Sequence, residues 1–278
     1  MDPHPPAAVE GRTPERRPAP GAVRPRERGA WGILLVPYAM GMLATWPPRD
    51  LPGAAVGLLL VFALFIAQAA LLPWLSGEQA RARAREAAGW SLLVVAAAIV
   101  LACRVGLRPL GPVGAAAAAL LSLHLLARSE RGRRDVWAQW SGAAGLSLSG
   151  ALAVVTQDPA ELRLAWLVWG LAALYFTAGI SLVRSCIAAR AAQSPLRRAR
   201  GVRGAVAWHA GAAFLYAAGA GAGLLPWSVP VTFLPALARL GWYLRKPRLD
   251  LSPRQLGWRE VLLSMVFAAG ALGFPLLP

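Results

Sequence analysis

Acidic residues are scarce in this chain of 278 residues, which contains 13 Asp and Glu but 29 Lys and Arg. It has only two Cys and three His, and no His lies at a metal-ligand spacing from a Cys or a second His. Charged residues make up 15% of the chain, whereas a soluble domain has about 25%. These shortages argue against a soluble globule and against a metal site, and the sequence indicates no cofactor.

The chain contains long apolar runs. Hydrophobic residues make up 57% of the chain, and the mean hydropathy is +0.49. The runs are apolar all round, are rich in Ala and Leu, and approach the roughly 20 residues that a membrane-spanning helix needs. The predicted fold is therefore all-α, a polytopic transmembrane bundle of about nine spans. The predicted helices are Ala30–Trp46, Pro52–Leu75, Trp90–Cys103 with a few more residues, Leu110–Ala127, Val136–Thr156, Leu164–Val183, Gly204–Gly223, Leu224–Leu244 and Val261–Leu277.

The basic residues predict the orientation of the bundle. Twenty-four of the 29 Lys and Arg residues lie in the N-terminal tail or in every second break between the apolar runs, and four lie in the other breaks. Because cytoplasmic loops of membrane proteins are enriched in Lys and Arg, the N-terminus is predicted to be cytoplasmic. Nine spans then place Pro278 outside.

The chain divides into two predicted regions. Residues 1–29 hold seven Pro and six Arg and contain no apolar run, so they cannot bury a core and are predicted to be a disordered cytoplasmic tail. Residues 30–278 form the transmembrane helical bundle. Within it, Ser141, Gly145 and Ser149 make a stripe of small residues, and Gly219 and Gly223 have GxxxG spacing; both patterns favour close helix packing.

Arg239 is the strongest candidate for a functional residue. It lies inside the predicted eighth helix, where insertion of an Arg near the membrane centre costs about 2.5–3.5 kcal/mol. Glu260 is its candidate partner, and His209 is predicted near the same membrane face. The alternatives are an Arg239 that extends to the membrane surface and a His209 that only packs between helices. The predicted partner is membrane lipid, including anionic head groups, rather than nucleic acid.

Three sequence segments carry a family resemblance. They are RGAWGILLVPY from Arg28 to Tyr38, FLPALAR from Phe233 to Arg239, and SPRQLGWRE from Ser252 to Glu260. Together they resemble the YwiC-like family of bacterial membrane proteins over residues 28–277. The resemblance implies a multi-pass protein of the bacterial inner membrane and adds no chemistry. Arg28 occupies the position of a family His and joins the candidate anion- or lipid-contacting residues, and the family's Asn-Asp pair is missing after Glu130 and Arg131.

Nine spans are also similar, at the level of fold alone, to the UbiA-type prenyltransferases. Those enzymes bind a prenyl diphosphate through Mg²⁺ and aspartates in two cytoplasmic loops. The five Asp residues of this chain lie elsewhere, so that chemistry is not expected. A transporter or a lipid- or anion-binding bundle is the favoured function, and no catalytic constellation supports an enzyme. A UbiA-like enzyme without the Asp and Mg²⁺ motifs, or a membrane accessory or assembly subunit, stays open as an alternative.

Overall fold

The computed structural model describes residues 28–75, 80–131, 135–191, 195–245 and 253–272. These residues form helices without strands, which confirms the predicted all-α fold. The predicted tail, residues 1–29, lies almost wholly outside the described residues. The helices are α1 (Arg28–Ala44), α2 (Leu51–Leu75), α3 (Ala80–Val105), α4 (Leu107–Arg131), α5 (Val136–Gln157), α6 (Leu162–Ala191), α7 (Pro195–Gly221), α8 (Ser228–Arg245) and α9 (Pro253–Leu272).

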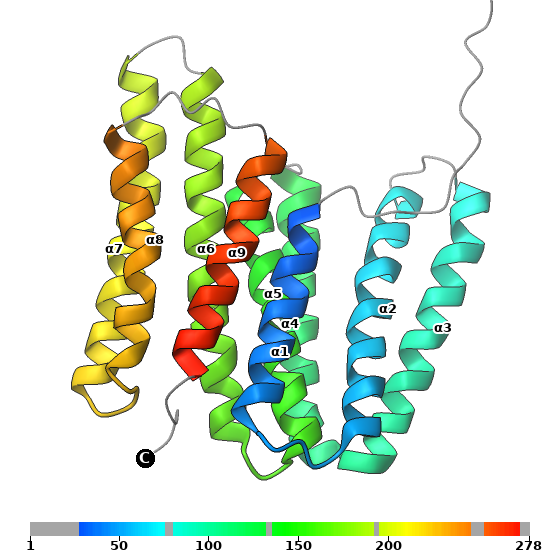
Figure 1. The fold of residues 1–278 in the computed structure, drawn as a ribbon. Coiled ribbons are helices and arrows are strands. Elements are labelled where there is room, and N and C mark those ends of the chain that lie inside the picture. Colours follow the sequence, from blue (N-terminus) through cyan, green and yellow to red (C-terminus); the bar gives the residue numbers. More distant parts are fainter. Residues whose placement is uncertain (1–27, 76–79, 132–134, 192–194, 246–252, 273–278) are drawn as a thin grey trace, which may run out of the picture.

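Consecutive helices run in opposite directions, so the bundle has two distinct ends (Figure 1). We call the end at which α1, α3, α5, α7 and α9 begin the arginine-rich end. The arginines of this end whose side chains the structure describes are Arg85, Arg128, Arg184, Arg203, Arg245 and Arg259. The opposite, arginine-poor end holds Arg49, Arg104, Arg108 and Arg163. The alternating helix directions therefore place most of these arginines at one end of the bundle, as their positions in the sequence predicted.

Helix α5 is the centre of the bundle. It packs against α1, α2, α4 and α6, and 14 of its 22 residues are buried. The helix begins at Val136 because the Asp135 side chain accepts hydrogen bonds from the backbone N–H groups of Trp137 (2.9 Å) and Ala138 (3.3 Å). A helix surrounded by other helices meets little lipid, which allows α5 to carry several Ser and Gly residues.

The contact between α1 and α5 depends on small residues. An added Cβ at Gly150 would lie 2.8 Å from the Pro37 carbonyl oxygen, and one at Gly41 would clash with the Gly150 carbonyl. The Ser149 hydroxyl donates to the Leu34 carbonyl at 2.7 Å, next to the carbonyl that Pro37 leaves without its helical donor. Of the predicted small-residue stripe, Ser149 therefore lies at the α1–α5 contact, where its side chain joins the two backbones, whereas Gly145 faces Leu120 of α4.

Three helices begin several residues earlier than predicted. Helix α3 begins at Ala80 instead of Trp90, α7 at Pro195 instead of Gly204, and α9 at Pro253 instead of Val261. Ala, Arg, Leu and Gln are good helix formers in water as well as in lipid. The charged residues mark the end of an apolar run, but the helix continues past them into the polar region.

The junction of α7 and α8 corrects the prediction in the other direction. Residues 222–227 form a turn, and α8 begins at Ser228 instead of Leu224. Gly223 adopts a positive φ of 70° in this turn, and Gly219 packs against Leu225 of the same connection. The predicted GxxxG pair therefore shapes a tight turn and does not form a helix–helix contact.

Four of the described helices are long and apolar enough to cross a membrane: α2, α3, α4 and α6. The apolar part of α1, Ala30–Ala44, is shorter. The prediction of a membrane protein is thereby supported, whereas the count of nine spans and the orientation of the N-terminus remain predictions. Only 11% of the apolar stretch is buried in α3 and in α4, against 50% in α6, so α3 and α4 form an outer edge of the bundle.

Candidate functional site

The structure pairs two of the residues singled out from the sequence. Arg239 of α8 forms an ion pair with Glu260 of α9, and their side chains are only 9% and 20% exposed. Arg239 lies six residues before the end of α8, about 9 Å along the helix axis from the arginine-rich end. Arg239 therefore turns toward a neighbouring helix and does not extend freely to the surface.

Two further buried polar side chains lie near enough to this pair to be affected by its charges. His209 of α7 is completely buried, and Tyr175 of α6 is 4% exposed. The charges of Arg239 and Glu260 both act on the Tyr175 hydroxyl, and the charge of Arg239 also acts on His209. We call Tyr175, His209, Arg239 and Glu260 the α6–α9 polar cluster; each of these four helices contributes one of its residues.

The cluster contains polar atoms whose hydrogen-bonding capacity is unused. Among the described residues, the Tyr175 hydroxyl, His209 Nε2, Arg239 Nε and Glu260 Oε1 are buried without a hydrogen-bond partner. His209 Nδ1 lies 2.9 Å from the Ala205 carbonyl oxygen, which can only accept, so Nδ1 carries the hydrogen and Nε2 is an acceptor. A buried polar atom without a partner costs about 1–3 kcal/mol, which favours a polar occupant.

Packing around the cluster is tight on one side and aromatic on the other. An added Cβ at Gly179 of α6 would lie 3.2 Å from Glu260 Oε2, so the glycine makes room for the carboxylate. The Tyr175 ring stacks on Phe267 with a centroid distance of 4.3 Å, and Phe233 contacts both Tyr175 and Tyr216 edge-on. These rings keep the surroundings of the ion pair apolar, which strengthens electrostatic interactions within it.

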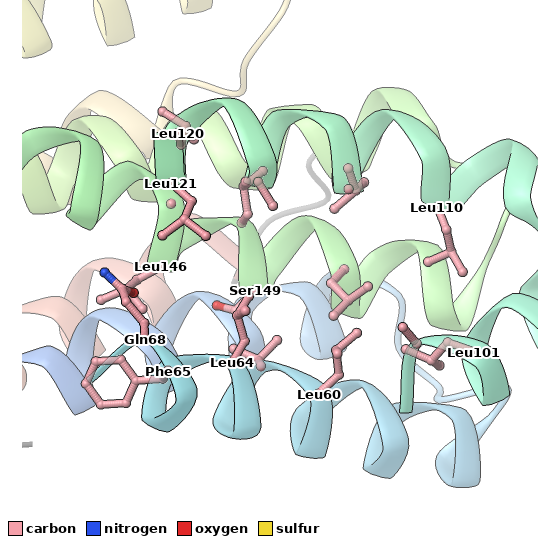
Figure 2. Close-up of a pocket in the computed structure, with 18 of the residues that line it drawn as sticks. Leu60, Leu64, Phe65, Gln68, Leu101, Leu110, Leu120, Leu121, Leu146 and Ser149 are labelled. Atoms are coloured by element: carbon pink, nitrogen blue, oxygen red, sulfur yellow. The ribbon is translucent and has the colours of Figure 1, made fainter. Parts of the chain in front are cut away.

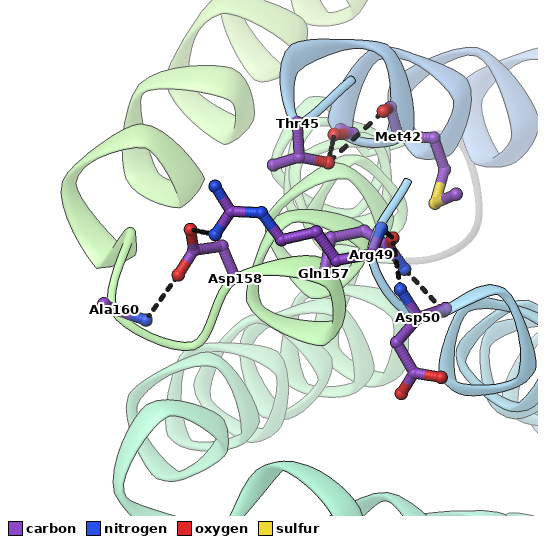
Figure 3. A network of polar contacts seen from close by, with 8 residues as sticks. Met42, Thr45, Arg49, Asp50, Gln157, Asp158 and Ala160 are labelled. Carbon is purple, nitrogen blue, oxygen red and sulfur yellow. Dashed lines mark hydrogen bonds and ion pairs between the residues drawn. The ribbon is translucent and has the colours of Figure 1, made fainter. Parts of the chain in front are cut away.

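The arginine-poor end carries a different, more exposed polar network (Figure 3). Arg49 forms an ion pair with Asp158. The Gln157 side chain accepts from the backbone N–H of Arg49 (2.8 Å) and donates to the Asp50 carbonyl (2.7 Å). Asp50 also pairs with Arg104 at 2.8 Å. This network ties the α1–α2 connection to the ends of α3 and α5 and has a structural role.

The hydrogen bonds of this network explain the pKa of the Asp50 carboxyl. The hydrogen bond from Arg104 and a second one from the Gly53 backbone N–H lower the pKa of the Asp50 carboxyl below its ordinary value of 3.8. Both contacts lie close to solvent, because the Arg104 side chain is 44% exposed. The effect on stability is therefore small.

A cavity of about 350 Å³ lies between α2, α3, α4 and α5 (Figure 2). Its lining is mainly leucine, alanine and glycine, with four polar side chains: Gln68, His124, Ser141 and Ser149. The cavity exists because α2 packs closely against α3, whereas α3 and α4 contact each other far less. No sequence pattern indicates this cavity, since no residue type marks an unfilled space.

The remaining sequence candidates have mixed outcomes. Arg28 begins α1, but its side chain lies outside the described residues. Tyr175 was missed, because a tyrosine inside an apolar helix usually only packs. In the described part of the chain, His, Cys, Asp and Glu do not gather in threes that could hold a metal ion.

The comparisons with known proteins agree with part of this picture. The family model described as YwiC-like protein matches residues 24–155, and this region includes α1 to α4 and nearly all of α5. No curated protein and no solved structure matches the chain. The α2–α5 cavity lies within the matched region, whereas the α6–α9 polar cluster lies beyond it. The resemblance seen in the opening motif is thus confirmed: the chain carries a YwiC-like region over residues 24–155.

Proposed function

We propose that the protein is a multi-pass protein of the bacterial inner membrane that binds an anionic group at the α6–α9 polar cluster. The observation that carries this proposal is a buried Arg239 whose ion pair with Glu260 leaves the Arg239 Nε hydrogen without a partner among the described residues. Ionisable residues at membrane depth are rare and usually mark a binding site or a transport pathway. The proposal fits a transporter or a lipid-binding bundle.

The chemistry of the cluster favours an anion that competes with Glu260. A guanidinium presents five N–H donors in a planar fork that suits phosphate and carboxylate oxygens. The Tyr175 hydroxyl can donate a further hydrogen bond to the same anion. Because Arg239 and Glu260 neutralise each other, an incoming anion has to displace the Glu260 carboxylate. Glu260 is therefore the competitor of the ligand, and breaking the ion pair is the step that links binding to movement of α8 against α9.

Substitutions at the two residues test this exchange, because they have opposite expected effects. The purified full-length protein in detergent is titrated with inorganic phosphate and, separately, reconstituted with phosphatidylglycerol. Arg239→Gln removes the positive charge and is expected to weaken anion binding by at least about tenfold, as expected for a lost charge-assisted hydrogen bond. Glu260→Gln removes the competitor and is expected to tighten binding. Arg245→Gln, which changes an exposed Arg on the same helix, is the matched control.

The two probes distinguish the source of the anion. Tighter binding of phosphate to Glu260→Gln supports a small soluble anion, and tighter retention of phosphatidylglycerol alone supports a lipid head group. If Arg239→Gln and Glu260→Gln lower thermal stability and the double variant restores it, with no change in either titration, the pair is a structural element of an accessory subunit and the proposal is wrong.

The proposed orientation places the arginine-rich end in the cytoplasm. Reporter fusions after Arg85, Arg134, Arg203 and Arg259 are expected to report a cytoplasmic location, and a fusion at Pro278 an external one. A cytoplasmic Pro278 would contradict the nine-span count, while leaving the orientation of α1 intact.

A further inference from the structure

The α2–α5 cavity has two chemically different ends. Gln68 lies on α2, His124 on α4 and Ser141 on α5, and the helix directions place all three toward the arginine-rich end. Toward the arginine-poor end the lining is apolar, with Leu101 and Leu110 among its residues. Figure 2 shows Gln68 beside Phe65 at one side of the cavity and the two leucines at the other. The cavity is therefore amphipathic along the membrane normal.

The polar groups at the first end have hydrogen-bonding capacity to spare. His124 Nδ1 lies 2.6 Å from the Ala138 carbonyl oxygen; since that oxygen only accepts, Nδ1 carries the hydrogen and Nε2 is an acceptor. The Ser141 hydroxyl donates to the Trp137 carbonyl at 2.7 Å. The half-buried Gln68 amide lines the same end of the cavity, and an amide in apolar surroundings is costly without a hydrogen bond. An occupant with a hydroxyl group satisfies both residues, because its hydrogen can be donated to His124 Nε2 while its oxygen accepts from the Gln68 amide N–H.

The size and position of the cavity fit a single chain. Cavities of about 150 Å³ lined by apolar side chains accommodate benzene, so about 350 Å³ accommodates roughly 14 carbons on the same scale. An added Cβ at Gly111 or at Gly114 of α4 would meet nothing within 4 Å, so these glycines leave the space open. The walls α3 and α4 are the most exposed of the four apolar helices, and a chain can reach the cavity from the surrounding lipid.

We propose that the α2–α5 cavity binds a single-chain lipid with a hydroxyl-bearing head group. The head lies at Gln68 and His124, near the arginine-rich end, and the chain extends along the leucines toward the arginine-poor end. The site is separate from the α6–α9 polar cluster, because the two share no residue and lie on different helices.

The test uses the full-length protein and two probes with the same chain. Purified protein is reconstituted in nanodiscs with 1-monomyristoylglycerol or with methyl myristate, which lacks the hydroxyls, and bound lipid is measured by native mass spectrometry. Gly114→Leu fills the cavity and is expected to lower retention of 1-monomyristoylglycerol by at least about tenfold, since the chain and the new side chain cannot share the space. Gly89→Leu is the matched control, because Gly89 also has open space around it and does not line the cavity.

The polar end is tested with Gln68→Leu. Loss of a hydrogen bond at this position is expected to lower retention of 1-monomyristoylglycerol by about three- to tenfold and to leave methyl myristate unchanged or better retained. Equal retention of both probes by the original protein would show that the head group is not recognised. Equal retention by Gly114→Leu and Gly89→Leu, with both proteins folded by thermal unfolding, would show that the lipid binds elsewhere and would overturn the proposal.

Discussion

The α6–α9 polar cluster and the α2–α5 cavity lie in neighbouring parts of one bundle and differ in how their sequence reveals them. The cluster is built from residues that are expensive in a membrane, and Arg239 was visible at once inside an apolar run. The cavity is built from leucine and glycine, which are ordinary in such runs. A site built from unusual side chains can be found in the sequence. A cavity forms where side chains leave space unfilled, so it can be found only from the packing of the helices.

The largest expected effect is the loss of the buried charge in the α6–α9 polar cluster. Arg239→Leu leaves Glu260 buried without its partner and is expected to destabilise the protein by about 3–5 kcal/mol. Arg239→Leu combined with Glu260→Leu is expected to restore most of that stability. Thermal unfolding in detergent measures both. The control is Arg104→Leu, at an exposed ion pair, with an expected loss of at most about 1 kcal/mol. If Arg239→Leu raises stability, Arg239 is dispensable and its charge only adds a cost.

A smaller effect compares a filled and an open part of the bundle with one substitution. Gly150→Ala places a Cβ 2.8 Å from the Pro37 carbonyl oxygen and is expected to cost about 1–3 kcal/mol through overpacking. Gly114→Ala meets open space and is expected to stabilise by up to about 1 kcal/mol, the gain in helix propensity. Thermal unfolding of the two variants measures the opposite signs. Equal destabilisation by both would mean that α4 packs tightly at Gly114 and that the cavity is closed.

The smallest expected effect concerns pH and the exposed network. Because the Asp50 pKa is lowered on folding, its contribution to stability is present above the ordinary value of 3.8 and is lost as the pH falls below it. The difference in melting temperature between the original protein and Asp50→Asn is therefore expected near neutral pH and absent under strongly acidic conditions. A difference that persists unchanged at acidic pH would show that the Asp50 charge makes no contribution.

Sequence reasoning was most successful where a local property sets the structure. Apolar length predicted the helices, and the alternation of arginine breaks predicted which helix ends lie together. Boundaries such as the start of α3 at Ala80 were missed, because hydropathy marks the lipid-compatible part of a helix and hydrogen bonding continues beyond it. Glu260 was predicted as a candidate partner of Arg239, because both residues lie near the same membrane face, and the alternative of an Arg239 that extends to the surface was left open.

The sequence by itself determined an all-α chain with a strong charge asymmetry, a YwiC-like opening region and an Arg inside its predicted eighth helix with Glu260 as a candidate partner. Only the tertiary structure decided that Arg239 pairs with Glu260, that Gly179 packs against this pair, and that α2–α5 line a cavity. The reason is physical. Helix formation and insertion depend on residues that are neighbours in sequence, whereas a cavity or a cluster depends on which faces of distant helices meet and on how closely they approach.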